Sequence, residues 1–473
     1  MTGVKFGKPV ASTVKQTTSH TMLRMPLTDP LVQDLTLEDR QYLSYFASDV
    51  CKDLVVYDNL DKHPFRGLIP LTCEYPALLQ IMIANSAMRL SNVLSTPSGI
   101  NVTPQISAKS LPLTRYSTVL SSHTMSQALR AKQRGLCLLR DALASRGEMP
   151  PDVLLAVILL FLGFELLYSG QDDWSHHTMG ARKLIEDLLV THGDTETPIS
   201  PLRKFLISNC IVYVNMDSII TRHESLTRRS FDIIGSALAS PTSFENATPS
   251  RDTALSLLQD AEGNHCASFP TLLLQVMQRV AQLYRGSQHS EHDSFGHCSV
   301  EKQTRLLLRT AQSFDPLTWA TNIQHHSPTS DLLHRMHVAS AHRAAVCIYL
   351  SRLLISSDPD ARPGQSLDPL VSEAIHHMSH IRQCDPLFAA TTWPAFVAGA
   401  ETNDVQQRDW ITERFQELWQ GEPWGTGRSA SDVLRGIWSD KNERIVHGEH
   451  GSARDSADWI SNLKNAGVDW LII

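Results

Sequence analysis

The chain has 473 residues, of which 42% are hydrophobic and 19% charged, and its formal net charge is −7. This composition is typical of a chain that buries a core, because disordered chains are poorer in apolar residues and more highly charged. The acidic balance argues against a phosphate-binding surface, which usually carries a basic excess. The densest basic spot, residues 222–229 (RHESLTRR), includes an acid, and we interpret it as an exposed helix end.

The cysteines do not have the spacing of a zinc site. No two of the eight are separated by two residues, as zinc ligands commonly are; they occupy positions 51, 73, 137, 210, 266, 298, 347 and 384. Several lie within apolar helical runs, where free cysteine behaves as a small buried hydrophobe. We therefore expect a reducing, intracellular compartment.

In chain order, residues 1–34 are predicted to be a flexible polar leader, with no apolar stretch of the kind found in signal peptides. Thr36 followed by Asp39 resembles a helix-capping box, so order is expected to begin there. Leu43, Phe46 and Val50 then form one apolar helical face. Pro76 suits the first turn of a helix that runs to about residue 94.

The same three- and four-residue apolar spacing continues through the chain. It predicts helices at about 116–146, 152–168, 174–191, 201–223, 270–285, 300–313, 330–356, 367–382, 404–420 and 430–446. Loops are expected at 92–113, 240–250 and 286–299, and the glycine-rich segment 421–428 (GEPWGTGR) is expected to connect two helices. The apolar run 153–167 is shorter than a membrane span needs, so we expect a buried core helix.

These elements predict an all-α protein of stacked antiparallel helices over residues 35–446, with a C-terminal tail at 447–473. Alternating Val/Ile/Thr-rich runs are scarce, so few strands are expected.

No specific catalytic, phosphate-binding or metal-binding motif is present in the sequence. His289, His292, His297 and Cys298 could supply zinc ligands, but their irregular spacing favours a solvated polar loop. His376 and His380 lie one helical turn apart, again without an obvious acidic partner. We therefore predict no catalytic residue, no cofactor and no metal site.

Two segments carry a resemblance to a known family. The first spans residues 35–91 and includes LTLEDRQYLSYFASDV and DKHPFRGLIPLTCEYPALLQIMIANSAMRLS. The second spans 391–440 and joins TTWPAFVAGAETNDVQQRDWITERFQEL to the helix SDVLRGIWSD, which contains Trp438. Between them, ALRAKQRGLCLLRDALA, FLGFELLYSG and WSHHTMGARKLI fit the same pattern. Over residues 35–445 the chain resembles the second type of fungal-specific transcription factor domain, the helical regulatory region of fungal zinc-cluster transcription regulators.

The resemblance implies a nuclear regulator of transcription, pathway-specific for secondary or nutrient metabolism, that is not an enzyme. It implies that the chain binds the transcription machinery or other regulators. It also implies a small-molecule effector and a homodimer, and no association with a membrane. Trp393, Pro394 and Gly399 would fix a helix start and a close helix crossing.

The family's DNA reader is a six-cysteine zinc cluster, and no C-x2-C-x6-C precedes residue 35. Contact with DNA is therefore expected only indirectly or through such a cluster outside this sequence. The alternative function is a ligand-sensing or scaffold protein that does not bind DNA and acts through partner proteins. An enzyme that uses a buried helical pocket is a third, less favoured interpretation, because no motif chemistry supports it.

Overall fold

The computed structural model describes residues 32–60, 63–95, 113–145, 149–171, 174–192, 199–220, 262–288, 294–324, 327, 331–357, 366–446 and 458–472. Within these ranges the protein is all-α, as predicted. Extended pairing there is limited to two isolated antiparallel bridges, Val55 with His265 and Gln171 with Trp470. The basic spot at 222–229 and the predicted loop at 240–250 lie outside the described residues.

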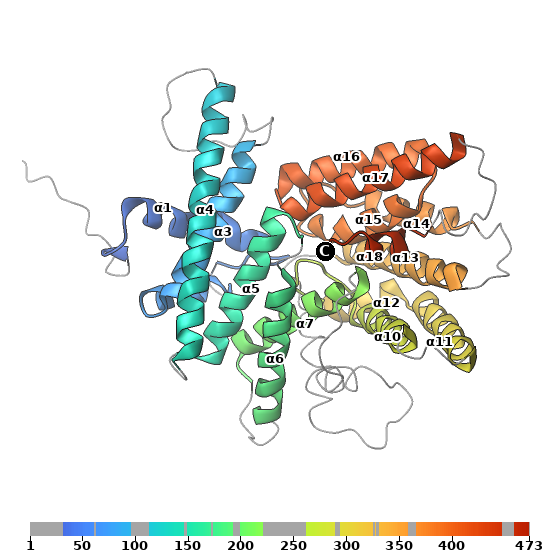
Figure 1. Ribbon diagram of the computed structural model, residues 1–473, viewed down its shortest axis with the longest axis horizontal. Coiled ribbons are helices and arrows are strands. Elements are labelled where there is room, and N and C mark those ends of the chain that lie inside the picture. Colours follow the sequence, from blue (N-terminus) through green and yellow to red (C-terminus); the bar gives the residue numbers. More distant parts are fainter. Residues whose placement is uncertain are drawn as a thin grey trace, which may run out of the picture.

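The first half of the chain forms one group of helices, coloured blue to green in Figure 1. It contains α1 (Leu37–Tyr45), the π-helical turn η2 (Phe46–Val50), α2 (Cys51–Asp53), the 3-10 helix η3 (Arg66–Cys73), α3 (Pro76–Ser95), α4 (Leu113–Ala144), α5 (Pro151–Tyr168), α6 (Trp174–His192) and α7 (Pro201–Ile220). Helices α3 and α4 lie side by side, and α5 packs against α3, α6 and α7.

The second half forms a second group, coloured yellow to red. It contains α10 (Thr271–Gln288), α11 (Ser294–Ser313), α12 (Pro316–Ile323), α13 (Leu332–Ser357), α14 (Asp368–Ser379), η5 (Ala389–Thr391), α15 (Thr392–Glu401), α16 (Val405–Gly421), α17 (Gly425–Val446) and α18 (Trp459–Asn465). Helix α13 contacts α10, α11, α12, α14 and α15 and so forms the centre of this group.

Local chemistry explains where several helices begin and end. The Thr36 hydroxyl accepts a hydrogen bond from the Asp39 amide at 3.1 Å and caps α1, which confirms the predicted start. Pro76 and Pro151 occupy the first positions of α3 and α5, where no amide hydrogen is needed. After α5 the chain turns through Gly170, whose φ of +67° suits a residue without a Cβ.

The long apolar helix α5 is a core helix, as predicted. Every residue from Val153 to Leu167 except Leu154 is buried within the protein. Helix α13 is similarly long and apolar, and most of its residues are also buried among other helices. Both helices could cross a membrane by length and composition alone, but here both are packed into the hydrophobic core.

Two sequence predictions need correction. The predicted loop at 286–299 is partly helical, because α10 continues to Gln288 and α11 begins at Ser294. The glycine-rich segment 421–428 is not a connection throughout, because α17 begins at Gly425 and the connection is residues 422–424. Polar composition is misleading in the first case and glycine content in the second, because neither signal alone decides whether a segment is helical.

Part of the segment predicted as a C-terminal tail packs on the core. Trp459, Ile460 and Leu463 of α18 are buried, and so are Leu471 and Ile472 beyond it. Residues 458–472 therefore extend the helical body beyond residue 446.

Candidate functional site

The motif that carries the family resemblance builds a close crossing of three helices. A Cβ on Gly399 of α15 would lie 2.9 Å from Leu434 Cδ1 of α17 and 3.0 Å from Ile411 Cγ2 of α16. The Trp438 indole N–H donates to the Gly399 carbonyl at 2.8 Å. Pro394 lies in the first turn of α15, where its missing amide hydrogen is harmless. The helix start and the close crossing expected at these residues are therefore confirmed.

The last residue of the same motif, Glu401, lies at the centre of a buried polar cluster. Arg352 of α13 forms a bidentate ion pair with its carboxylate, with one of the two N–O distances 3.0 Å. The Trp459 indole N–H donates to Glu401 Oε2 at 3.2 Å. Lys441 of α17 donates to the carbonyls of Ala400 and Glu401, both at 2.8 Å. One glutamate thus ties α13, α17 and α18 to the end of α15.

The two groups of helices meet where the α16–α17 connection contacts the ends of α3 and α5. The Asn92 side-chain amide donates to the Leu167 carbonyl of α5 at 2.8 Å and to the Pro423 carbonyl of the connection at 2.9 Å. A Cβ on Gly425 would lie only 2.2 Å from the Tyr168 carbonyl oxygen. We call this region, formed by Asn92, the end of α5 and residues 422–425, the joint.

Leu471 also contacts the joint. The Leu471 amide donates to the Gly170 carbonyl at 2.9 Å, and the Thr426 hydroxyl donates to the Leu471 carbonyl at 2.6 Å. Backbone from both halves of the sequence is therefore interlocked at this point.

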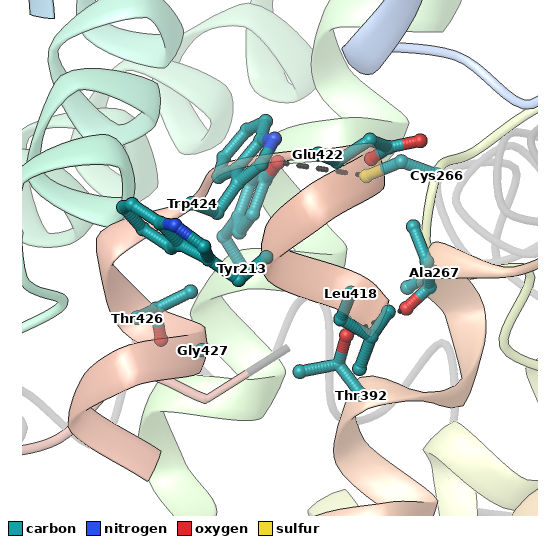
Figure 2. Close-up of a pocket in the computed structure, with 11 residues that line it drawn as sticks. Tyr213, Cys266, Ala267, Thr392, Leu418, Glu422, Trp424, Thr426 and Gly427 are labelled. Carbon is teal, nitrogen blue, oxygen red and sulfur yellow. Dashed lines mark hydrogen bonds between the residues drawn. The ribbon is translucent and has the colours of Figure 1, made fainter. Parts of the chain in front are cut away.

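A pocket lies beside the joint and is bounded by both groups of helices (Figure 2). Its cavity volume is about 50 Å³, which is room for about three to five water molecules and therefore suits only a compact ligand. The residues that line it come from α7, the segment before α10, η5, α15, α16, the connection and α17: Tyr213, Cys266, Ala267, Ala389, Thr392, Leu418, Trp419, Glu422, Trp424, Thr426 and Gly427.

Several polar groups in the pocket have few partners among the described residues. The Tyr213 hydroxyl and the Cys266 thiol are 3.9 Å apart, a weak interaction that Figure 2 marks. The Trp424 indole N–H is buried and has no hydrogen-bond partner in the described part of the chain. Burial raises the pKa of Cys266 to about 11 and that of Tyr213 well above its usual value, so both are neutral at pH 7.

Glu422 is the one acid among the described residues that line the pocket. Burial and the nearby charge of Asp53 raise its pKa from 4.5 to about 8, so it is mostly protonated at pH 7. The neighbouring Arg89 does not neutralise it, because Arg89 is engaged with Asp53 (Nε to Oδ2, 2.5 Å) and with the Tyr45 hydroxyl at 2.7 Å.

The histidines that stand out in the sequence lie elsewhere. His289 and His292 are outside the described residues, and His297 and Cys298 lie in the first turns of α11. His377 and His380, at the end of α14, contact His337 of α13, which no sequence pattern singles out, and the His376 ring contacts those of His377 and His380.

Within that histidine cluster, His337 Nδ1 is 2.9 Å from His377 Nδ1, and the His337 and His380 rings stack at 4.0 Å. Desolvation and the surrounding histidines lower the pKa of His337 to about 4. Among the described residues, no three His, Cys, Asp or Glu side chains have a geometry that would hold a metal ion.

Sequence reasoning misses the pocket because its residues are spread over both halves of the chain. The only local signal is the segment Glu422–Pro423–Trp424, between Gly421 and Gly425. The glycines indicate a connection between helices, but nothing in the sequence shows that the acid and the indole between them face a cavity.

Comparison with known proteins agrees with the resemblance. The profile of the fungal-specific transcription factor domain matches residues 41–473. The acriflavine sensitivity control protein acr-2 of Neurospora crassa is 31% identical over 458 residues, which cover 96% of this chain and 70% of that protein. No solved structure matches the chain significantly. The chain is a fungal transcription regulator and belongs to the fungal-specific transcription factor domain family.

Proposed function

We propose that the protein is a nuclear, pathway-specific regulator that controls genes of secondary or nutrient metabolism through its helical domain. The observation that carries this proposal is the family match across residues 41–473, with the family's closing motif packed as a buried helix crossing. The net charge of −7 supports a regulatory rather than a DNA-gripping role for the helical body. Contact with promoters would then pass through partner proteins or a zinc cluster outside this sequence.

In this proposal the helical domain acts by binding and not by catalysis. The Cys266 thiol, the strongest nucleophile among the described residues that line the pocket, has a raised pKa and so is not activated. A small effector in the pocket would contact both groups of helices. It would therefore favour whichever arrangement of the joint binds it better, as a ligand does in any two-state equilibrium.

The test is a deletion of the gene, followed by transcript profiling and complementation with the complete gene. We expect a coherent set of pathway genes to change and to recover on complementation. A fluorescent fusion should accumulate in the nucleus. Unchanged transcripts together with a cytoplasmic fusion would contradict the proposal and favour the alternative, a ligand-sensing or scaffold protein that does not reach promoters.

A second candidate target set follows from the name of the relative, which controls sensitivity to acriflavine. We propose that genes which set tolerance to toxic aromatic compounds belong to the same regulon. Growth of the deletion strain on a graded series of acriflavine tests this directly. Wild-type tolerance in the deletion strain would remove this candidate and leave the metabolic one in place.

A further inference from the structure

The charge of the pocket walls restricts the class of ligand. Among the described residues that line the pocket, none is Lys, Arg or His, and Glu422 is the one side chain that can carry a charge at neutral pH. A phosphate or carboxylate ligand would find no opposite charge on these walls and would have to be desolvated beside an acid. Anionic metabolites are therefore poor candidates.

The aromatic walls favour the opposite charge. Tyr213, Trp419 and Trp424 supply three aromatic rings, and the faces of such rings attract cations. One of these rings already holds a cation on the protein itself, since the Arg428 guanidinium lies 3.5 Å from the centre of the Trp419 ring. The remaining ring surfaces lie in a pocket from which bulk water is partly excluded, where cation–π attraction is stronger than at an exposed site.

We propose that this pocket binds a compact organic cation that also carries a hydrogen-bond acceptor, such as an amino alcohol or a choline-like ammonium ion. The Glu422 carboxylate would face the positive charge, and the aromatic rings would surround it. The buried Trp424 N–H, which has no partner among the described residues, would donate to the acceptor. The carboxylate and the aromatic rings select the positive charge of the ligand, and the indole N–H selects its hydrogen-bond acceptor. Only the three features together specify this class of ligand.

Binding should release a proton from Glu422. Without a bound cation the Glu422 carboxyl is mostly protonated at pH 7, and a bound cation would stabilise its ionised form. The charged groups around Glu422 are Asp53 of α2 and Arg89 of α3, with the neutral Cys266 thiol beside it. The charge of Asp53 is already balanced by its ion pair with Arg89. Glu422 must therefore supply the negative charge that balances the bound cation. Affinity for the cation should therefore increase with pH up to about pH 8.

A ligand in this position would touch Tyr213 of α7 and the α16–α17 connection together. It would thereby link the two groups of helices next to the joint. The regulatory meaning of this contact rests on the proposed function, but the binding itself does not, and the two are measured separately.

The experiment compares choline with its neutral isostere, 3,3-dimethylbutan-1-ol, on the purified full chain. Both have the same shape and hydroxyl, so the difference in affinity reports the charge. Tryptophan fluorescence and calorimetry at about pH 7 should give a dissociation constant for choline at least about tenfold below that of the isostere, a difference of about 1.4 kcal/mol. For choline the constant should fall by up to about tenfold per pH unit between about pH 6 and about pH 8.

Three variants locate the effect. Glu422→Gln should abolish both the preference for choline and its pH dependence while leaving the isostere unchanged. Trp424→Phe keeps an aromatic ring but removes the N–H. It should weaken the binding of both choline and the isostere, because both carry the hydroxyl acceptor. Glu417→Gln, at a partly exposed acid of α16 outside the pocket lining, should change nothing.

Equal affinity for the two probes would overturn the proposal, because the pocket would then recognise the shape of the ligand and not its charge. So would choline binding that Glu422→Gln does not alter, or no binding of choline and of benzyltrimethylammonium up to roughly 10 mM. None of these results would affect the transcript profiles of the deletion strain, so failure here is distinct from failure of the regulatory role.

Discussion

Replacing Gly425 with alanine should separate the two groups of helices at the joint. The new Cβ would lie 2.2 Å from the Tyr168 carbonyl oxygen, 2.5 Å from its carbon and 2.6 Å from the Leu167 oxygen. All three are backbone atoms at the end of α5, so no side chain can rotate away. The start of α17 must therefore move by about 1 Å, and such overpacking costs about 1–3 kcal/mol.

The same movement displaces Pro423 from the Asn92 amide, which bridges it to Leu167. Weakening this partly buried hydrogen bond adds about 1–3 kcal/mol. We therefore expect the free energy of unfolding to fall by about 2–6 kcal/mol in total. Urea denaturation followed by far-UV circular dichroism measures this change as a lower midpoint.

Gly436→Ala is the matched control. Gly436 lies in the same helix and is exposed, and a methyl group added there would have nothing within 4 Å apart from the adjacent backbone of its own helix. In that helix interior alanine should raise stability by about 0.5–1 kcal/mol. If the free energy of unfolding of Gly425→Ala lies within about 1 kcal/mol of that of Gly436→Ala, the joint is not tightly packed and the expected clash is refuted.

Three further predictions concern the core, the pocket acid and DNA. Trp459→Ala should lower the free energy of unfolding by about 3–5 kcal/mol, whereas Trp459→Phe, which mainly loses the hydrogen bond to Glu401, should lose about 1 kcal/mol in the same urea titration. The pKa of Glu422 lies at about 8 in the folded chain against an ordinary 4.5, so the folded state binds the extra proton. This group should therefore reduce stability as the pH rises from 4.5 to about 8, by up to about 1.4 kcal/mol per unit, and Glu422→Gln should flatten that part of the pH profile; an identical slope in both proteins would contradict the assignment. Residues 1–473 alone should bind promoter DNA weakly and without sequence preference in fluorescence anisotropy at about 0.15 M salt, and nanomolar, sequence-dependent binding would show a DNA-binding surface that the charge pattern does not reveal.

Helices whose apolar residues fall on one face could be predicted from the sequence. Helix α16 is a clear case, because Ile411, Phe415 and Leu418 are buried on one side of an otherwise polar helix. Helix α15 is different, since all ten of its residues are buried and no amphipathic period exists to detect. Only the resemblance to the family places a helix start at Trp393 and Pro394.

The candidate site could not be predicted in the same way. Tyr213 and Glu422 lie in opposite halves of the chain, and no local pattern records that they line one cavity. The raised pKa of Glu422 depends on burial and on Asp53, which comes from the far end of the chain. Such properties arise from tertiary packing, and the sequence specifies them only through the complete fold. The division at residue 446 stays a prediction, although the packing of 458–472 favours including that segment in the regulatory domain.

The contacts of Trp459 and Leu471 determine which parts of the protein can be completed before translation reaches these residues. Domains generally fold from the N-terminus as the chain emerges, but Trp459 supplies one partner of Glu401 and Leu471 supplies the acceptor for Thr426. Both contacts must wait until translation has passed these codons. Until then the first helices can assemble while the Glu401 cluster and the crossing at Gly170 stay incomplete. A ribosome that stalls just before them would therefore release a product whose buried glutamate lacks one of its partners, a natural substrate for the cell's quality control.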